Sequence, residues 1–232
     1  MNSLTRHVFA ASLLATAAHA ATAALIDRGG GMVYDSDQNI TWLQDFGAGG
    51  LQYWQSAADW ADNLAHGGYT DWRLPATLQP DPGCSDDAGP GGGAPVQSAG
   101  YGCTGSEMGY LFYNHLGGNA GESVLDPTGD SAQELANLAL FENIQAYRYY
   151  SGTSYAPSPA ALAWSFGFGH GLQSVDFKVP DGLGSYAVAV RDGDVASTVP
   201  EPTGLALTLT ALGLLLVAGA RRPMAAKTAA GA

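Results

Sequence analysis

The residues best suited to chemistry are two cysteines and three histidines in the central part of the 232-residue chain. Cys84 and Cys103 are its only cysteines and bracket a loop rich in proline and glycine. If the chain is exported, an even pair closing such a loop predicts a disulfide, which stabilises by about 3 kcal/mol through lost unfolded-state entropy. A metal site would need further ligands, and His66, His115 and His170 lie far apart without a known ligand spacing.

Residues 35–39 alternate oxygen-bearing side chains, as the start of an EF-hand calcium loop does. Such a loop continues with glycine and ends on glutamate, whereas this chain has Ile40 and Phe46 at those positions. The segment is therefore interpreted as a hairpin turn between strands at residues 32–34 and 40–42. The acidic surface is compatible with calcium, but no segment locates a calcium site, and no cofactor is expected.

Common catalytic signatures are missing from the sequence. It contains no Gly-x-Ser-x-Gly elbow, no His-Glu-x-x-His and no phosphate-binding loop, and its carboxylates form no pair that indicates a glycosidase. His170 lies between two glycines and is interpreted as a polar turn residue. The chain is expected not to be an enzyme.

Aromatic side chains offer a binding chemistry instead. Tyr149, Tyr150, Tyr155 and Trp164 cluster in the second half of the chain, and amphipathic rings stack well on sugars. If exposed, they would contact an extracellular polysaccharide. The alternative is a structural envelope or biofilm component that is displayed without a specific ligand.

Three short helices are predicted to position these residues. The first spans residues 55–65, the second begins at Ser106 and stops at Gly117, and the third begins at Ser131, whose spacing to Glu134 matches a capping box. The apolar stripes of the first two follow a period of 3.6 residues. Their members are Ala57, Trp60, Ala61, Leu64, Met108, Leu111, Phe112 and His115.

A period of two predicts strands in the second half of the chain. One strand face carries Leu162, Trp164, Phe166 and Phe168, and after a turn at residues 169–171 a returning strand carries Gln173, Val175, Phe177 and Val179. A final strand carries Tyr186, Val188 and Val190. The expected fold class is α+β and loop-rich, with two or three short helices packed on one twisted antiparallel sheet.

Residues 25–198 have the length of one domain. From residue 25 onward this region holds twenty acidic and five basic residues, a formal charge of 5 − 20 = −15. Such a surface repels phosphate backbones, so nucleic acids are not expected as partners. Residues 78–103 lack any hydrophobic period and are interpreted as a surface insertion closed by the cysteines.

The chain ends indicate export. Residues 1–20 read as a signal peptide, in which Arg6 and His7 precede an apolar stretch and Ala18-His19-Ala20 provides the small-x-small cleavage pattern. Cleavage after Ala23 is an open alternative. At the other end, the seventeen residues 204–220 carry no charge and reach about 25 Å as a helix, just enough for a thin bilayer. Residues 223–232 would then form a cytoplasmic tail.

The order of parts at this end resembles the PEP-CTERM sorting signal of Gram-negative bacteria. Pro200, Glu201 and Pro202 precede the apolar helix, and Arg221 and Arg222 follow it. The resemblance covers residues 199–222 and implies processing by an exosortase in the inner membrane. The protein would be held transiently in that membrane and then reach the cell surface or an extracellular matrix, typically in exopolysaccharide producers. An ordinary tail anchor is the alternative.

A second resemblance extends over most of residues 25–198. The block Asp71, Trp72, Arg73, Leu74 and Pro75 is its most specific part. Residues 39–45, which include Trp42, and residues 107–112, 149–155 and 187–191 agree in order. Together they resemble the Lcl C-terminal domain family, a domain of unknown function. The family implies a fold similar to C-type lectins and formylglycine-generating enzymes, and some members bind sulfated glycans. A formylglycine-generating-enzyme-like activity is the less favoured alternative.

The chain departs from these relatives at functional positions. The calcium-lectin motifs Glu-Pro-Asn, Gln-Pro-Asp and Trp-Asn-Asp are missing. The two cysteines do not lie where a formylglycine-generating enzyme has its oxidase cysteines. The Asp71–Pro75 block is interpreted as structural: Trp72 and Leu74 face the core, and Asp71 or another carboxylate holds Arg73. A ligand-binding Arg73 remains the alternative.

Overall fold

The fold begins with the hairpin predicted around residues 35–39. The computed structural model describes residues 24–85, 97–179 and 184–195. Strand β2 (Met32–Asp35) pairs antiparallel with β3 (Ile40–Leu43). In the turn, the Asp35 carboxylate accepts hydrogen bonds from the N–H groups of Asp37 and Gln38, and Asn39 adopts a φ of 53°. Local side-chain capping of the turn thus explains the run of polar residues.

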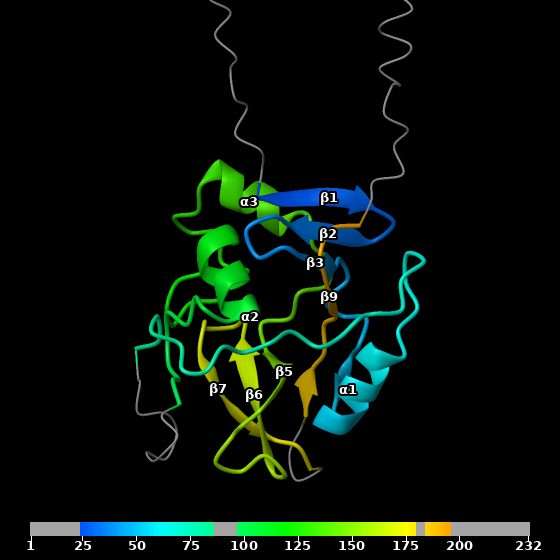
Figure 1. Ribbon diagram of the computed structural model, residues 1–232. Coiled ribbons are helices and arrows are strands. Elements are labelled where there is room, and N and C mark those ends of the chain that lie inside the picture. Colours follow the sequence, from blue (N-terminus) through cyan, green and yellow to red (C-terminus); the bar gives the residue numbers. More distant parts are fainter. Residues whose placement is uncertain (1–23, 86–96, 180–183, 196–232) are drawn as a thin grey trace, which may run out of the picture. The chain divides into compact units, whose positions relative to one another are not determined.

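Two sheets form the framework (Figure 1). The first is antiparallel, in the order β1-β2-β3-β9, and adds β1 (Leu25–Gly29) and β9 (Val190–Asp192) to the hairpin. The second has the order β4-β8-β5-β6-β7 and is mixed because β5 and β8 run parallel. Its strands are β4 (Leu51–Gln52), β5 (Arg148–Ser154), β6 (Leu162–Gly167), β7 (Gln173–Phe177) and β8 (Ser185–Tyr186).

The prediction of a single antiparallel sheet is therefore wrong, although the α+β class holds. The predicted last strand divides: β8 pairs with β4 and β5, while β9 pairs with β3. The intervening residues Ala187, Val188 and Ala189 are fully buried as they pass from one sheet to the other. A strand pattern cannot reveal this change of partner, because the five consecutive residues 186–190 are all apolar. The switch depends on the strands that lie on either side.

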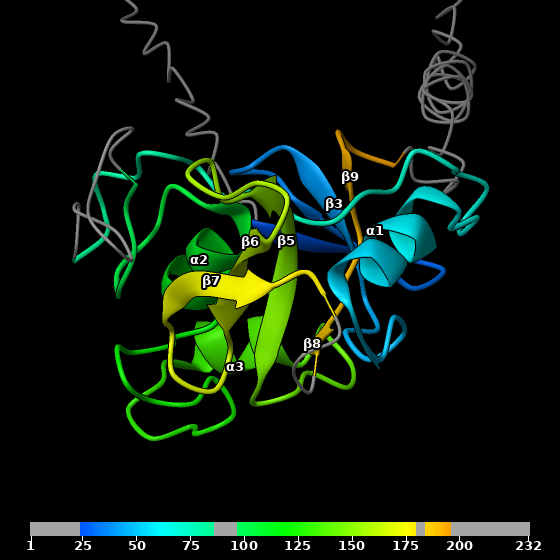
Figure 2. The same ribbon diagram turned by 90° about the horizontal axis from the view of Figure 1, so that it is seen from below.

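The predicted helices are present. They are α1 (Trp54–Asp62), α2 (Glu107–Tyr110) continued by a π-helical turn η1 (Leu111–His115), and α3 (Ala132–Leu138). The Ser131–Glu134 capping box forms as predicted. Ser106 occupies the N-cap position of α2, but its hydroxyl accepts from Leu78 N–H rather than from the helix. Figure 2 shows α1 lying apart from α2 and α3, beside β5 and β8.

One hydrophobic cluster joins both sheets to the helices. It includes Trp42 and Val190 from the first sheet, Phe166 from the second and Met108 and Phe112 from α2 and η1. All four residues predicted for the stripe of the second helix are buried. Along β7 and the residues that follow it, the predicted alternation holds only at the start: Gln173 is buried, whereas Phe177 and Val179 are about half exposed (53% and 48%).

The insertion is closed by a Cys84–Cys103 disulfide, as predicted. Its second arm does not lie loosely on the surface: Gln97, Ser98 and Ala99 are buried, and Gly100 pairs with Gln173 through two backbone hydrogen bonds of 2.8 and 2.9 Å. The arm thereby covers part of the β7 edge, which would otherwise expose unpaired backbone groups. Residues 86–96 lie outside the described part.

The predicted end segments also lie outside it. These are the signal peptide at 1–20, the sorting signal at 199–222 with its helix at 204–220, and the tail at 223–232. The named elements all belong to one compact unit that ends at Gly193. Among the described residues, no helix is long and apolar enough to span a bilayer.

Candidate functional site

The four aromatic residues predicted to contact a glycan are buried. The exposed fraction of the residue is 0% for Tyr149 and Trp164, 1% for Tyr150 and 7% for Tyr155. Tyr149 and Tyr150 use their hydroxyls inside the protein, toward Gln145 N–H and the Phe177 carbonyl. The prediction of an exposed sugar-stacking cluster is therefore wrong, because both faces of β5 and β6 are covered and the rings supply the core.

The Asp71–Pro75 block links the two sheets. Arg73 forms an antiparallel bridge to Val190 of β9, with both hydrogen bonds at 2.8 Å. Two residues later the Pro75 carbonyl accepts from Gly152 N–H and the Ser151 hydroxyl of β5 at 2.9 and 2.8 Å. Trp72 and Leu74 are buried between these contacts, at 2% and 5% exposure, as predicted. The block is thus a strap between the sheets.

The carboxylate that holds Arg73 comes from α2. Both terminal nitrogens of Arg73 donate to Glu107, at 2.9 and 2.7 Å, and Glu107 also accepts from Ala76 N–H at 2.6 Å. Asp192 receives two more hydrogen bonds from the guanidinium. The hydrogen bonds to Glu107, opposed by burial, raise the pKa of Arg73. With its charge balanced twice, Arg73 has a structural role, and its use as a primary ligand contact is disfavoured.

Asp71 binds a different arginine. Its two carboxylate oxygens accept from Nε and Nη2 of Arg191, both at 2.9 Å. These hydrogen bonds lower the pKa of Asp71. The Arg191 guanidinium also lies 4.1 Å from the centre of the Tyr69 ring. Neighbouring residues of β9 therefore hold both ends of the Asp71–Arg73 segment, which sequence alone could not pair.

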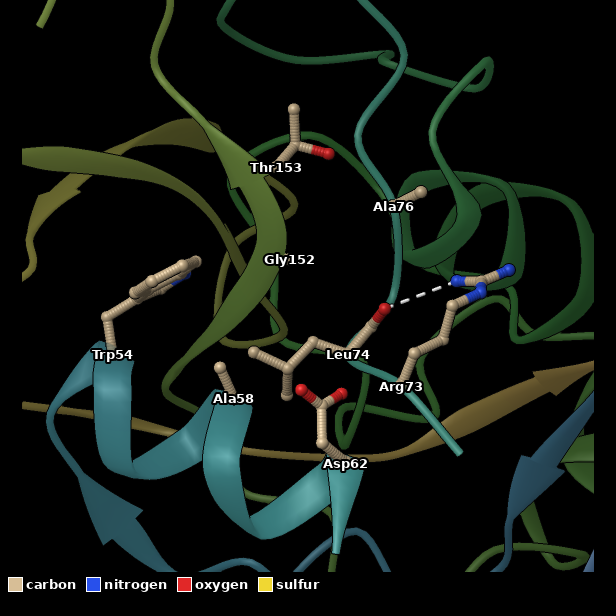
Figure 3. A pocket seen from close by; sticks show the side chains of 8 residues that line it. All are labelled: Trp54, Ala58, Asp62, Arg73, Leu74, Ala76, Gly152 and Thr153. Atoms are coloured by element: carbon tan, nitrogen blue, oxygen red, sulfur yellow. Dashed lines mark hydrogen bonds between the residues drawn. The ribbon is translucent and has the colours of Figure 1, made fainter. Parts of the chain in front are cut away.

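Beside this strap lies a cavity of about 390 Å³ (Figure 3). Helix α1 lines it with Trp54, Ala58 and Asp62, the strap with Arg73, Leu74 and Ala76, and β5 with Gly152 and Thr153. Figure 3 shows the Arg73 guanidinium turned away from Trp54 and Asp62, toward α2. The volume is at the lower end of the range typical of small-molecule sites. We take this hollow, the Trp54 cavity, as the candidate functional site.

Trp54 is held firmly at the wall of the cavity. Its indole N–H donates to the Ser151 carbonyl at 2.8 Å. The Lys178 ammonium lies 3.6 Å from the ring centre and is anchored by Ser154 and Pro159 at 2.6 and 2.8 Å. Lys178 does not line the cavity, and burial lowers its pKa. A fixed ring of this kind is a low-entropy surface for stacking.

The polar groups of the Trp54 cavity favour a neutral ligand rich in hydroxyl groups. Asp62 is exposed, and no hydrogen bond to its carboxylate is formed by the described residues. It can therefore accept from a ligand hydroxyl. Arg73 is already neutralised by Glu107 and Asp192, so the cavity offers no free cation for an anionic sugar. Stacking on an indole beside a hydroxyl acceptor is the chemistry of sugar recognition.

Other polar clusters serve the fold. His115 Nε2 lies 3.3 Å from Asp35 Oδ1, both side chains being buried, so that helix η1 is tied to the first hairpin. Burial opposes ionisation of Asp35, but the adjacent His115 ring and the hydrogen bonds from Gln38 outweigh it, and its pKa lies below the ordinary value. His170 accepts a hydrogen bond from Leu172 N–H within its turn, as expected of a turn residue.

Asp81 is a buried polar residue that sequence reasoning missed. Its carboxylate accepts from the N–H groups of Gly83 and Gly105, both at 2.9 Å. It lies beside Cys84 and Cys103, with one oxygen and two sulfur atoms within 4.8 Å of one another. Because the two sulfurs are bonded to each other, they are not the thiolates that a metal would bind. Asp81 therefore orders the base of the insertion.

The Trp54 cavity was also missed, although a signal for it exists. Trp54, Ala58 and Asp62 fall at i, i+4 and i+8, so they share a face of α1 distinct from the buried Ala57 and Ala61. The predicted helix began one residue too late to include Trp54. The contributions of the strap and β5 depend on tertiary contacts that no local pattern contains.

Comparison of the chain with protein-family models, curated proteins and solved structures found no match.

Proposed function

We propose that this chain is an exported surface or extracellular matrix protein whose lectin-like domain binds a neutral extracellular polysaccharide without catalysis. The observation that carries the proposal is the Trp54 cavity, whose lining combines a fixed indole with the exposed Asp62 carboxylate. The resemblance to the Lcl C-terminal domain family supports the lectin-like interpretation. The residues assigned to the glycan are now those of the cavity, in place of the buried aromatics.

Sorting by an exosortase is part of the same proposal. It is supported by the Pro200-Glu201-Pro202 triplet, the apolar run and the arginines that follow it. The disulfide is compatible with an oxidising compartment, which export would provide. Signal peptidase and the exosortase would then be processing partners, and the membrane a transient one. Mass spectrometry of the C-terminus in producing cells tests this: a mature chain that keeps residues 204–220 beside an active exosortase contradicts it.

The competing proposal is a displayed structural component without a ligand. The burial of Tyr149, Tyr150, Tyr155 and Trp164 favours it, since these rings serve the core. Retention of the full chain, in mild detergent, on the producer's own polysaccharide distinguishes the two proposals. If the Trp54 cavity binds the polysaccharide without calcium, the chain should be retained equally with added calcium and with a chelator. The same binding can be followed by affinity electrophoresis, in which the polysaccharide is cast into the gel. Equal migration of the chain in gels with and without polysaccharide would leave display as the function.

A further inference from the structure

A second cavity, of about 370 Å³, lies against another face of helix α1. Trp60 of the helix and Leu64, just beyond the helix end at Asp62, form one wall together with Leu43. Asp45, His66 and Glu142 are the titratable residues of its lining. Both tryptophan-lined cavities thus use the same short helix, and Trp60 and Trp54 belong to different ones.

The two acidic residues that line this cavity are paired with each other by the backbone. Asp45 and Glu142 are partners in a parallel bridge, closed by hydrogen bonds of 2.9 Å from Phe46 N–H to the Glu142 carbonyl and from Glu142 N–H to the Gln44 carbonyl. Like charges at paired positions repel each other and destabilise the pairing. None of the residues that line the cavity is a lysine or an arginine, so their charge is not balanced there.

Part of this acidic pair is already fixed in geometry. Asp45 Oδ1 accepts from Gly47 N–H at 2.8 Å and from the Asn143 amide at 2.9 Å. Within the described part of the chain, no donor reaches the Glu142 carboxylate. His66 is also oriented, because its Nε2 lies 2.7 Å from the Gly30 carbonyl and must donate to it. The cavity therefore has a negatively charged lining, partly fixed by hydrogen bonds, and one aromatic wall.

We propose that this hollow, the Trp60 cavity, binds a primary ammonium group carried on a compact ring or alkyl frame. The ammonium would lie between Asp45 and Glu142, relieving their repulsion, while the frame packs on Trp60 and Leu64. An aromatic face attracts an ammonium group through a cation–π interaction, and a carboxylate attracts it through a charge-assisted hydrogen bond. The two interactions act together in a partly enclosed site. The net negative charge of the domain concentrates cations at its surface. The site is independent of polysaccharide binding at Trp54.

The test follows the indole N–H signals of the full chain by NMR in mild detergent, with Trp60 assigned through Trp60→Phe. Glucosamine is expected to shift the Trp60 signal at pH 7, whereas N-acetylglucosamine, whose nitrogen is uncharged, does not. Spermidine identifies the source of the amine: tighter binding than glucosamine indicates polyamines, and weaker binding indicates amino sugars. Either result supports an ammonium site.

Variants make the assignment specific. Asp45→Asn with Glu142→Gln is expected to weaken glucosamine binding at least tenfold, and Asp45→Asn retains the oxygen that accepts from Gly47. Asp59→Asn, at an exposed position of the same helix that lines neither cavity, is the matched control and should leave the affinity unchanged. Equal shifts with both sugars, an unchanged affinity in the double variant, or saturation of the same signal by calcium alone overturns the proposal.

Discussion

Arg73 and Glu107 form the polar contact that fixes the strap to the helices. The pair is bidentate and only partly exposed, with side-chain exposures of 33% and 16%. Its inward neighbours Trp72 and Leu74 could be predicted from the period of two in an extended segment. Its partners could not, because Glu107 lies 34 and Asp192 119 residues from Arg73 in the chain.

We expect Arg73→Met to lower the free energy of unfolding by about 2 kcal/mol, since it leaves Glu107 partly buried without its cation. Glu107→Gln should cost about 1 kcal/mol, because an amide can still accept one of the hydrogen bonds. Urea unfolding followed by circular dichroism measures both. Glu122→Gln, at an exposed position, is the control. A structural role is contradicted if Arg73→Met is as stable as that control.

Asp35 should make the stability depend on acid. Its folded pKa lies below the ordinary value of 3.8, so the stabilisation is present above that pH and is lost as the pH falls through the folded pKa. We expect the free energy of unfolding to fall below about pH 4, and Asp35→Asn to flatten this slope. Urea titrations at pH 5, 4 and 3 measure it. An unchanged slope in Asp35→Asn, with Asp59→Asn as control, would contradict this assignment.

At the scale of elements, the insertion acts as an edge cover for the second sheet rather than as a surface loop. The ends of the insertion could be predicted from the sequence, because proline, glycine and the two cysteines mark them. The sequence did not show that Ser98 is buried, since this residue is held by hydrogen bonds with Gln79 and from Gln173, which are distant in the chain. Polar residues satisfied by tertiary partners carry no hydrophobic signal.

Removal of the disulfide tests this cover. Cys84→Ser with Cys103→Ser opens a loop with a sequence separation of 19 and should lower the free energy of unfolding by about 3 kcal/mol. Amide hydrogen exchange should accelerate at Gly100 and Gln173 in particular, because they pair the arm to β7. The wild type treated with a reductant should behave as the double variant does. Unchanged exchange at those two amides would show that the arm stays in place without the bond.

Helix α2 packs closely on the end of the insertion. A Cβ atom added at Gly109 would clash with the carbonyl oxygen of Cys103, whereas one at Gly152 would meet Leu74 at ordinary contact distances, 3.4 Å from its carbonyl oxygen and 3.5 Å from its Cβ. We expect Gly109→Ala to cost about 2 kcal/mol and Gly152→Ala less than about 0.5 kcal/mol. Thermal unfolding of both variants measures the difference. Similar melting temperatures would contradict this packing.

For the whole molecule, hydrophobic periodicity predicted the fold class but not the architecture. The helices and the first hairpin could be read from periodicity and turn residues, because these signals are local. The division into two sheets could not, since it depends on the crossing at Ala187–Ala189, where every position is buried. The prediction of the binding residues was wrong for a related reason: the four aromatic residues it named are needed for the core, whereas Trp54 and Trp60 of α1 line the two cavities described above.

The most direct measurement is a calorimetric titration of neutral oligosaccharides from the producer's polysaccharide into the full chain and into Ala58→Arg. Arginine suits a helix, and at this half-buried position it would fill the Trp54 cavity. Gln55→Arg adds the same charge at an exposed position of α1 and is the control. We predict that binding is lost in Ala58→Arg, with at least a tenfold weaker affinity, and is retained in Gln55→Arg. Equal binding by all three proteins, each folded by circular dichroism, would contradict a glycan site at Trp54.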